Sequence, residues 1–122
     1  MVVEPDVLVR MVIAEYLRDC GYKVIEGVSA KDVWAVLDGG RAPDVLLVDV
    51  KLSGKEDGFM VAKRVRQTRK DIDVMLTSGV ASTVQQSHEL CEEGPIQKPY
   101  DPKDVEARIR ILLERRRAAK KS

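Results

Sequence analysis

Apolar and polar positions follow one another along the chain in blocks that predict strands followed by helices. Residues 1–3 (MVV) and 44–50 (DVLLVDV) are short, nearly continuous apolar runs, which are typical of parallel strands covered on both faces. Residues 7–21 have a helical pattern that ends at Gly21. Five apolar residues in this pattern recur at helical spacing, namely Leu8, Val12, Ile13, Tyr16 and Leu17.

The remaining elements are expected on the same grounds. Residues 22–27, 72–79 and 95–97 read as strands, and helices are expected at 29–40, 58–70, 81–94 and 101–117. Ser29 with Asp32 gives a capping box, and Asp101 followed by Pro102 is a typical helix start. The inward-facing positions of the third and last helices are Phe59, Ala62, Val65, Val105, Ile109 and Leu112.

Five strand–helix units joined by short connections predict an α/β fold, an open and doubly wound parallel sheet with helices on both faces. No linker, repeat or low-complexity segment divides the sequence, so residues 1–122 are expected to form a single domain without a separate output domain.

Composition agrees with a globular protein. Apolar residues make up 44% and charged residues 34% of the 122 residues, and 21 Lys and Arg nearly balance 20 Asp and Glu. This balance gives no reason to expect a nucleic-acid partner.

No apolar run reaches membrane-spanning length and no signal peptide is evident, so a cytoplasmic protein is expected. Cys20 and Cys91 are expected to be reduced thiols.

The polar residues at the strand ends suggest chemistry. In a doubly wound sheet, ligands bind beyond the carboxyl ends of the strands. The residues expected there are three acids, two hydroxyls and one amine: Glu4, Asp6, Asp49, Thr77, Ser78 and Lys98. A carboxylate can accept a phosphoryl group, Mg²⁺ offsets the repulsion between close carboxylates, and lysine and hydroxyl donors stabilise the transferred group. The set therefore predicts phosphoryl chemistry.

In order, these residues resemble those of receiver domains in bacterial two-component response regulators (the CheY-like superfamily). The matching segments are the acids after the first strand, LLVDVKLSGKEDG with Asp49 and Gly58, MLTSG with Thr77, and QKPYD with Lys98. The resemblance covers essentially the whole chain. It implies a flavodoxin-like (βα)5 fold with strand order 2-1-3-4-5.

The resemblance also implies a mechanism. Asp49 would accept a phosphoryl group from a phosphohistidine on a sensor histidine kinase or a histidine phosphotransfer protein. Thr77 and Lys98 would contact the phosphoryl oxygens, and the Lys98–Pro99 peptide would be cis. Mg²⁺ would be held by oxygen ligands, which are Glu4, Asp6, Asp49 and the backbone carbonyl of Lys51. The lifetime of the phosphoryl group would depend on Lys51, Ser78 and Gly79.

Pro5 departs from the family pattern, because a second acid usually follows the first and ligates the metal. Proline supplies no carboxylate, and it restricts the backbone at Glu4. Two alternatives follow. In the favoured interpretation, Asp6 ligates the ion in place of the missing acid, in a rearranged site. In the other, the site binds Mg²⁺ poorly. In the second case the chain would be a pseudo-receiver, a protein-docking module that works without phosphorylation.

A second departure concerns signalling, since Pro95 stands where the family often has a switching aromatic ring. Switching would then involve the backbone and helix around residues 79–86. The expected downstream surface is the fourth helix, fifth strand and last helix, through which a homodimer could also form.

Other function classes fit less well. The chain is expected to be a switch and not a metabolic enzyme, with phosphorylation and dephosphorylation catalysed by its own site. An aspartyl-phosphate hydrolase needs an acid at the position of Lys51, and a nucleotide site needs a glycine-rich turn that the segment EPDVLVR lacks. His88, the only histidine, is expected on a solvated surface.

Overall fold

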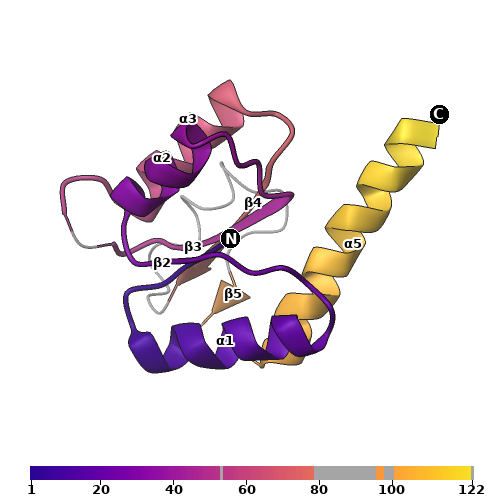
Figure 1. The fold of residues 1–122 in the computed structure, drawn as a ribbon, viewed down its shortest axis with the longest axis horizontal. Coiled ribbons are helices and arrows are strands. Elements are labelled where there is room, and N and C mark those ends of the chain that lie inside the picture. Colours follow the sequence, from indigo (N-terminus) through magenta and orange to yellow (C-terminus); the bar gives the residue numbers. More distant parts are fainter. Residues whose placement is uncertain (53, 79–95, 98–100, 122) are drawn as a thin grey trace.

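The computed structural model describes residues 1–52, 54–78, 96–97 and 101–121 of the chain (Figure 1). The strands are β1 (Val2–Val3), β2 (Glu26–Gly27), β3 (Val45–Asp49), β4 (Asp73–Ser78) and β5 (Ile96–Gln97). The helices are α1 (Val7–Asp19), α2 (Ala30–Asp38), α3 (Gly58–Thr68) and α5 (Pro102–Lys121). The expected helix at residues 81–94, with His88 and Cys91, lies outside the described residues.

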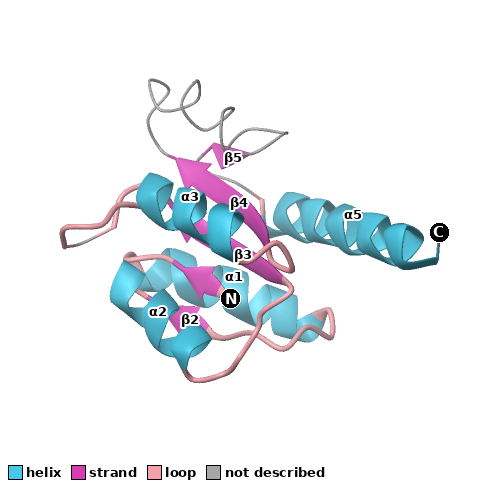
Figure 2. Cartoon of the chain, turned by 90° about the horizontal axis from the view of Figure 1, so that it is seen from above, coloured by secondary structure: helices cyan, strands magenta, loops and turns pink. Residues whose placement is uncertain are grey.

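All strand pairs in the sheet are parallel, and the order is β2-β1-β3-β4-β5. Figures 1 and 2 show α2 and α3 on one face of the sheet and α1 and α5 on the other. The predicted doubly wound fold with strand order 2-1-3-4-5 is therefore confirmed. The long central strand β3 is buried along its whole length, as its aliphatic sequence predicts.

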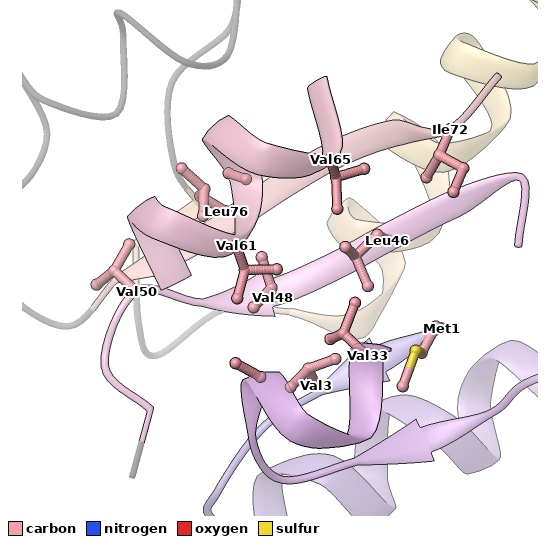
Figure 3. Close-up of a cluster of buried hydrophobic side chains, with 12 residues drawn as sticks. Met1, Val3, Val33, Leu46, Val48, Val50, Val61, Val65, Ile72 and Leu76 are labelled. Carbon is pink, nitrogen blue, oxygen red and sulfur yellow. The ribbon is translucent and has the colours of Figure 1, made fainter. Parts of the chain in front are cut away.

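Each face of the sheet has its own hydrophobic core. On the α2 and α3 side, Val33, Val61 and Val65 pack against Leu46 and Val48 of β3 (Figure 3). On the α1 and α5 side, the core joins residues from both helices to the strands, among them Ile13, Leu17, Leu47, Met75, Val105 and Ile109. The inward positions expected in α3 and α5 are thus buried or half-buried, as predicted.

Most elements differ in length from the sequence expectation by a few residues, and two of them show the cause. The strand expected at residues 22–27 is reduced to Glu26–Gly27, because its neighbour β1 offers only Val2 and Val3 for pairing. The last helix, in contrast, continues past Arg117 to Lys121, through residue types that favour helix. Its C-terminal turns extend beyond the sheet in Figures 1 and 2.

Helix α1 buries less of its apolar surface than its pattern suggests. Ile13, Ala14 and Leu17 are buried, but Leu8 is 74% exposed and Val12 is 55% exposed. The second half of α1 lies against α5 and the sheet core, whereas one side of the first two turns, with Leu8 and Val12, is exposed. Periodicity alone could not show this, because Leu8 and Val12 continue the apolar stripe.

The helix starts explain where the loops end. Asp32 accepts hydrogen bonds from the backbone N–H groups of Val28 and Ser29, which is the expected capping box of α2. Gly21 has a φ of +97°, the left-handed conformation expected of a residue just after a helix.

Cys20 is exposed and forms no disulfide. Within the described residues, no helix is long and apolar enough to span a bilayer.

Candidate functional site at the carboxyl edge of the sheet

Three polar residues lie buried where the central strands end. Asp49 is the last residue of β3 and pairs in register with Thr77 of β4. Glu4 directly follows β1, whose Val3 pairs with Val48, so Glu4 lies beside Asp49 at the same edge. Glu4 is 3% exposed, Asp49 7% and Thr77 2%. Buried polar side chains are costly unless they have partners, so their gathering at one edge marks this edge as the candidate site.

The turn that follows Asp49 is held by three hydrogen bonds from backbone N–H groups. The backbone N–H of Lys51 donates to Asp49 Oδ1 at 2.9 Å, and the Val50 N–H donates to the Thr77 carbonyl at 3.0 Å. The Gly58 N–H donates a hydrogen bond to the Val50 carbonyl at 2.9 Å, and this contact holds the start of α3 against the end of β3. A Cβ at Gly58 would lie 2.6 Å from the Val50 Cα. Glycine is required here by space, which explains its place in the motif.

The segment Glu4–Pro5–Asp6 is arranged around the start of α1. Asp6 is exposed, and its Oδ1 accepts hydrogen bonds from the N–H groups of Leu8 and Val9, at 3.0 and 3.2 Å. Asp6 is therefore the N-cap of α1. Glu4 Oε2 in turn accepts the Asp6 N–H at 3.1 Å. Pro5 lies between them and has no backbone N–H to donate.

The residues present fit a Mg²⁺ ion only in part. Glu4 and Asp49 supply two neighbouring carboxylates, and Mg²⁺ in proteins is often bound by one or two carboxylates with water completing its shell. Among the described residues, however, no three acidic, histidine or cysteine side chains gather as a ready-made metal site. Asp6, the third expected acid, points one oxygen at the helix cap, and the Lys51 contact to Asp49 is made by its N–H.

Several predicted site residues cannot be placed. Lys98, Pro99 and Gly79 lie outside the described residues, as does Pro95 of the expected switch, and only the backbone of Ser78 is described. The Lys51 side chain is exposed at the edge of the site. Of the residues predicted to act together, the structure brings Asp49 beside Glu4 and Thr77 and adds the Lys51 backbone.

Arg10 belongs to this edge and was not predicted from the sequence. Its Nη1 donates to the Glu4 carbonyl at 2.8 Å, and its Nε pairs with Glu26 Oε1 at 3.3 Å. Arg10 therefore connects the backbone after β1 to the first residue of β2. No pattern in the sequence pairs Arg10 with Glu26, because the contact depends on the fold placing β2 beside β1.

A cavity of about 500 Å³ lies elsewhere, lined by Met1, Val45 and Leu113 among others. Met1 and Val45 stand at the amino ends of β1 and β3, so this cavity is at the edge opposite Asp49. It is no part of the candidate site.

Comparison with known proteins supports the resemblance seen in the sequence. Residues 1–110 match the family model described as response regulator receiver domain. The chain is 29% identical over 119 residues to the phosphate regulon transcriptional regulatory protein PhoB of Pseudomonas aeruginosa. It is 32% identical over 119 residues to the regulatory protein VirG of Rhizobium rhizogenes.

These matches cover 94% and 95% of this chain but 51% and 48% of the relatives. The chain thus spans about half the length of the curated relatives it matches. Among solved structures, the receiver domain of NtrX from Brucella abortus superposes with a TM-score of 0.81 at 23% identity, covering 93% of this chain and 96% of that one. The family match over residues 1–110 shows that this chain belongs to the response regulator receiver domain family.

Proposed function

We propose that this receiver domain acts as a phosphorylation switch in two-component signalling and that Asp49 accepts the phosphoryl group. The observation that carries the proposal is the position of Asp49, buried at the end of β3 between Glu4 and Thr77. The Lys51 N–H donates to Asp49 Oδ1 at 2.9 Å and so helps to fix the orientation of the carboxylate. A carboxylate fixed in this way needs little reorientation before it attacks.

In the proposed reaction, a carboxylate oxygen of Asp49 attacks the phosphorus of a phosphohistidine in line with the phosphorus–nitrogen bond. The new oxygen–phosphorus bond forms as the phosphorus–nitrogen bond breaks, and the electron pair leaves on the imidazole nitrogen. The Thr77 hydroxyl and the Lys98 ammonium are proposed as donors to the phosphoryl oxygens. Hydrolysis of the acyl phosphate would return Asp49 to its starting state.

Mg²⁺ is proposed as the cofactor, where it would neutralise charge on the phosphoryl oxygens. Glu4, Asp49 and the Lys51 carbonyl are the proposed ligands. Asp6 would keep its cap on α1 and would reach the ion only through a bound water. This arrangement uses water where the family commonly has a second acid.

The test is the intact mass of the chain after incubation with acetyl phosphate, with and without Mg²⁺, beside Asp49→Asn. A single phosphoryl adduct that requires Mg²⁺ and is missing in Asp49→Asn is the expected result. An adduct that persists in Asp49→Asn would refute Asp49 as acceptor.

The second candidate function is phosphorylation-independent docking, and Pro5 together with the capping role of Asp6 favours it. If the folded wild-type chain takes up no phosphoryl group under conditions that label an ordinary receiver, this function replaces the first. Pro5→Asp would then restore a second acid beside Glu4, and labelling of that variant would identify Pro5 as the cause.

The proposed partners are a sensor histidine kinase or phosphotransfer protein upstream and an effector downstream. The first turns of α1, which expose an apolar side, follow directly from the site, since β1, Glu4 and the Asp6 cap lead into them. Val7, Leu8, Met11 and Val12 are 45–74% exposed there. We assign this apolar surface, called the α1 face below, to contact with the phosphodonor protein.

A further inference from the structure

A side-chain hydrogen bond connects helix α2 to the loop that follows Asp49. The indole Nε1–H of Trp34 in α2 donates to both carboxylate oxygens of Glu56, at 3.2 and 3.3 Å. Glu56 lies in the β3–α3 loop, 22 residues further along the chain and two before the start of α3. Both side chains are half-buried, and a hydrogen bond to an ionised carboxylate is among the stronger ones in proteins.

Trp34 is a rigid donor, because it is held from two sides. Its ring packs against the core on the α2 and α3 side of the sheet. The guanidinium carbon of Arg64, in α3, lies 4.4 Å from the ring centroid, a cation–π contact on the ring face. The N–H of an indole can only donate, so Glu56 meets a donor whose position is set by both helices.

The β3–α3 loop, which contains Glu56, also contains Lys51, whose backbone N–H donates to the proposed phosphoacceptor Asp49. Its two ends are fixed by backbone hydrogen bonds of Val50 and Gly58, and Leu52 packs partly against the core. The neighbouring positions Lys51, Gly54 and Lys55 are exposed. Glu56 therefore limits how far this exposed part of the loop can shift, and the Lys51 N–H is the group that a shift would move away from Asp49 Oδ1.

We infer that Trp34 and Glu56 are positioning residues of the Asp49 site, because their hydrogen bond keeps the Lys51 N–H on the acceptor carboxylate. The inference rests on the proposed function where it concerns phosphorylation. Without the bond, the hydrogen bond from the Lys51 N–H opens more often and the Asp49 carboxylate is less often aligned for attack. Neither residue touches the reacting atoms.

The experiment compares Trp34→Phe, Glu56→Ala and Glu56→Gln with the wild-type chain. Trp34→Phe keeps an aromatic ring under Arg64 but removes the donor and part of the ring volume, whereas Glu56→Ala removes the acceptor and Glu56→Gln keeps an acceptor oxygen. Lys63→Ala, an exposed position of the same helix α3, is the matched control. Amide hydrogen exchange by NMR reports the Lys51 N–H directly, and the rate of labelling by acetyl phosphate with Mg²⁺ reports the site.

Loss of one hydrogen bond corresponds to a roughly five- to tenfold faster exchange of the Lys51 amide in Trp34→Phe and Glu56→Ala. Labelling should slow about three- to fivefold in the same two variants, with Glu56→Gln and Lys63→Ala within about twofold of wild type. Amides inside β3 should exchange as in the wild type, which separates local positioning from general destabilisation.

Unchanged exchange of the Lys51 amide in both Trp34→Phe and Glu56→Ala would overturn the inference. So would faster exchange combined with unchanged labelling, since Asp49 would then not depend on the loop. If Trp34→Phe does not fold, Glu56→Ala decides alone. Failure of the wild-type chain to be labelled counts against the proposed function only, and the exchange result still decides whether the Trp34–Glu56 bond holds the loop.

Discussion

Gly58 shows how strictly a single position can be determined by its surroundings. The start of α3 lies against the backbone of Asp49 and Val50, so that no Cβ fits. We expect Gly58→Ala to lower the free energy of unfolding by about 3 kcal/mol, because backbone atoms cannot move aside as a side chain can. Gly54→Ala is the comparison, since Gly54 has φ +100° but open space around it.

Gly54→Ala should cost only about 1 kcal/mol, the strain of a left-handed residue. Urea unfolding followed by circular dichroism measures both variants. Equal losses at the two positions would show that conformation, and not close packing against β3, explains Gly58.

Asp6 carries a second prediction, because capping and metal binding require different chemistry. Asp6→Ala should lower the free energy of unfolding by about 1 kcal/mol through loss of the α1 cap, and Asp6→Asn by a few tenths at most. Since the proposed Mg²⁺ ligands are Glu4, Asp49 and the Lys51 carbonyl, Asp6→Asn should weaken Mg²⁺ binding by less than about threefold. Calorimetric titration with MgCl₂ measures this. A loss of tenfold or more would make Asp6 a direct ligand.

The sequence predicts some of these residue roles better than others. Asp49 and Thr77 could be placed at one edge because each ends a clear apolar strand, and parallel strands end together. The capping of α1 by Asp6 was not predicted, since an acid that caps a helix and an acid that follows a strand look identical at this position. The Trp34–Glu56 bond joins elements distant in sequence, so no local pattern contains it.

For helices and strands, the sequence predicts the type and order of the elements better than their lengths. The capping residues Ser29 and Asp32 and the central strand β3 lie where local signals place them. β2 is shorter than its pattern because a strand is limited by its partner, and β1 is short. Leu8 and Val12 of the α1 face belong to the same apolar pattern as Ile13 and Leu17, but periodicity shows only that residues share a face and not whether another element covers it.

The α1 face gives the prediction that belongs to this scale. Leu8→Glu and Met11→Glu place a charge in the surface proposed to bind the phosphodonor protein. Both positions are exposed, so we expect unfolding free energies within about 0.5 kcal/mol of wild type. Transfer from a phosphorylated sensor kinase that labels the wild-type chain should fall at least about tenfold, whereas labelling by acetyl phosphate stays unchanged.

Lys63→Glu, on α3, is the control for charge alone. Radiolabelled phosphotransfer followed over seconds to minutes measures the protein-dependent rate. If the α1 variants accept phosphoryl groups from the kinase as fast as Lys63→Glu does, the phosphodonor binds elsewhere.

At the scale of the whole molecule, the edge opposite Asp49 contains a buried ionisable group. The amino group of Met1 donates to the Val45 carbonyl at 2.8 Å, at the amino ends of β1 and β3. Burial lowers the pKa of this amino group from 8.0 to about 6, and the nearby Asp44 carboxylate opposes part of that change. Because Met1 and Val45 join the two central strands, the protonation of this amine is linked to folding of the whole sheet.

The consequence is a rise of stability with pH. Between pH 6 and 8 the unfolded chain binds a proton at Met1 that the folded chain does not, so the free energy of unfolding should increase by about 2–3 kcal/mol across this window and level off above it. Urea unfolding from pH 5.5 to 8.5 measures the slope. Nα-acetylation of Met1 removes the titrating group and should flatten this slope. An equal slope in the acetylated chain would assign it to other groups, because acetylation leaves every other titratable side chain in place.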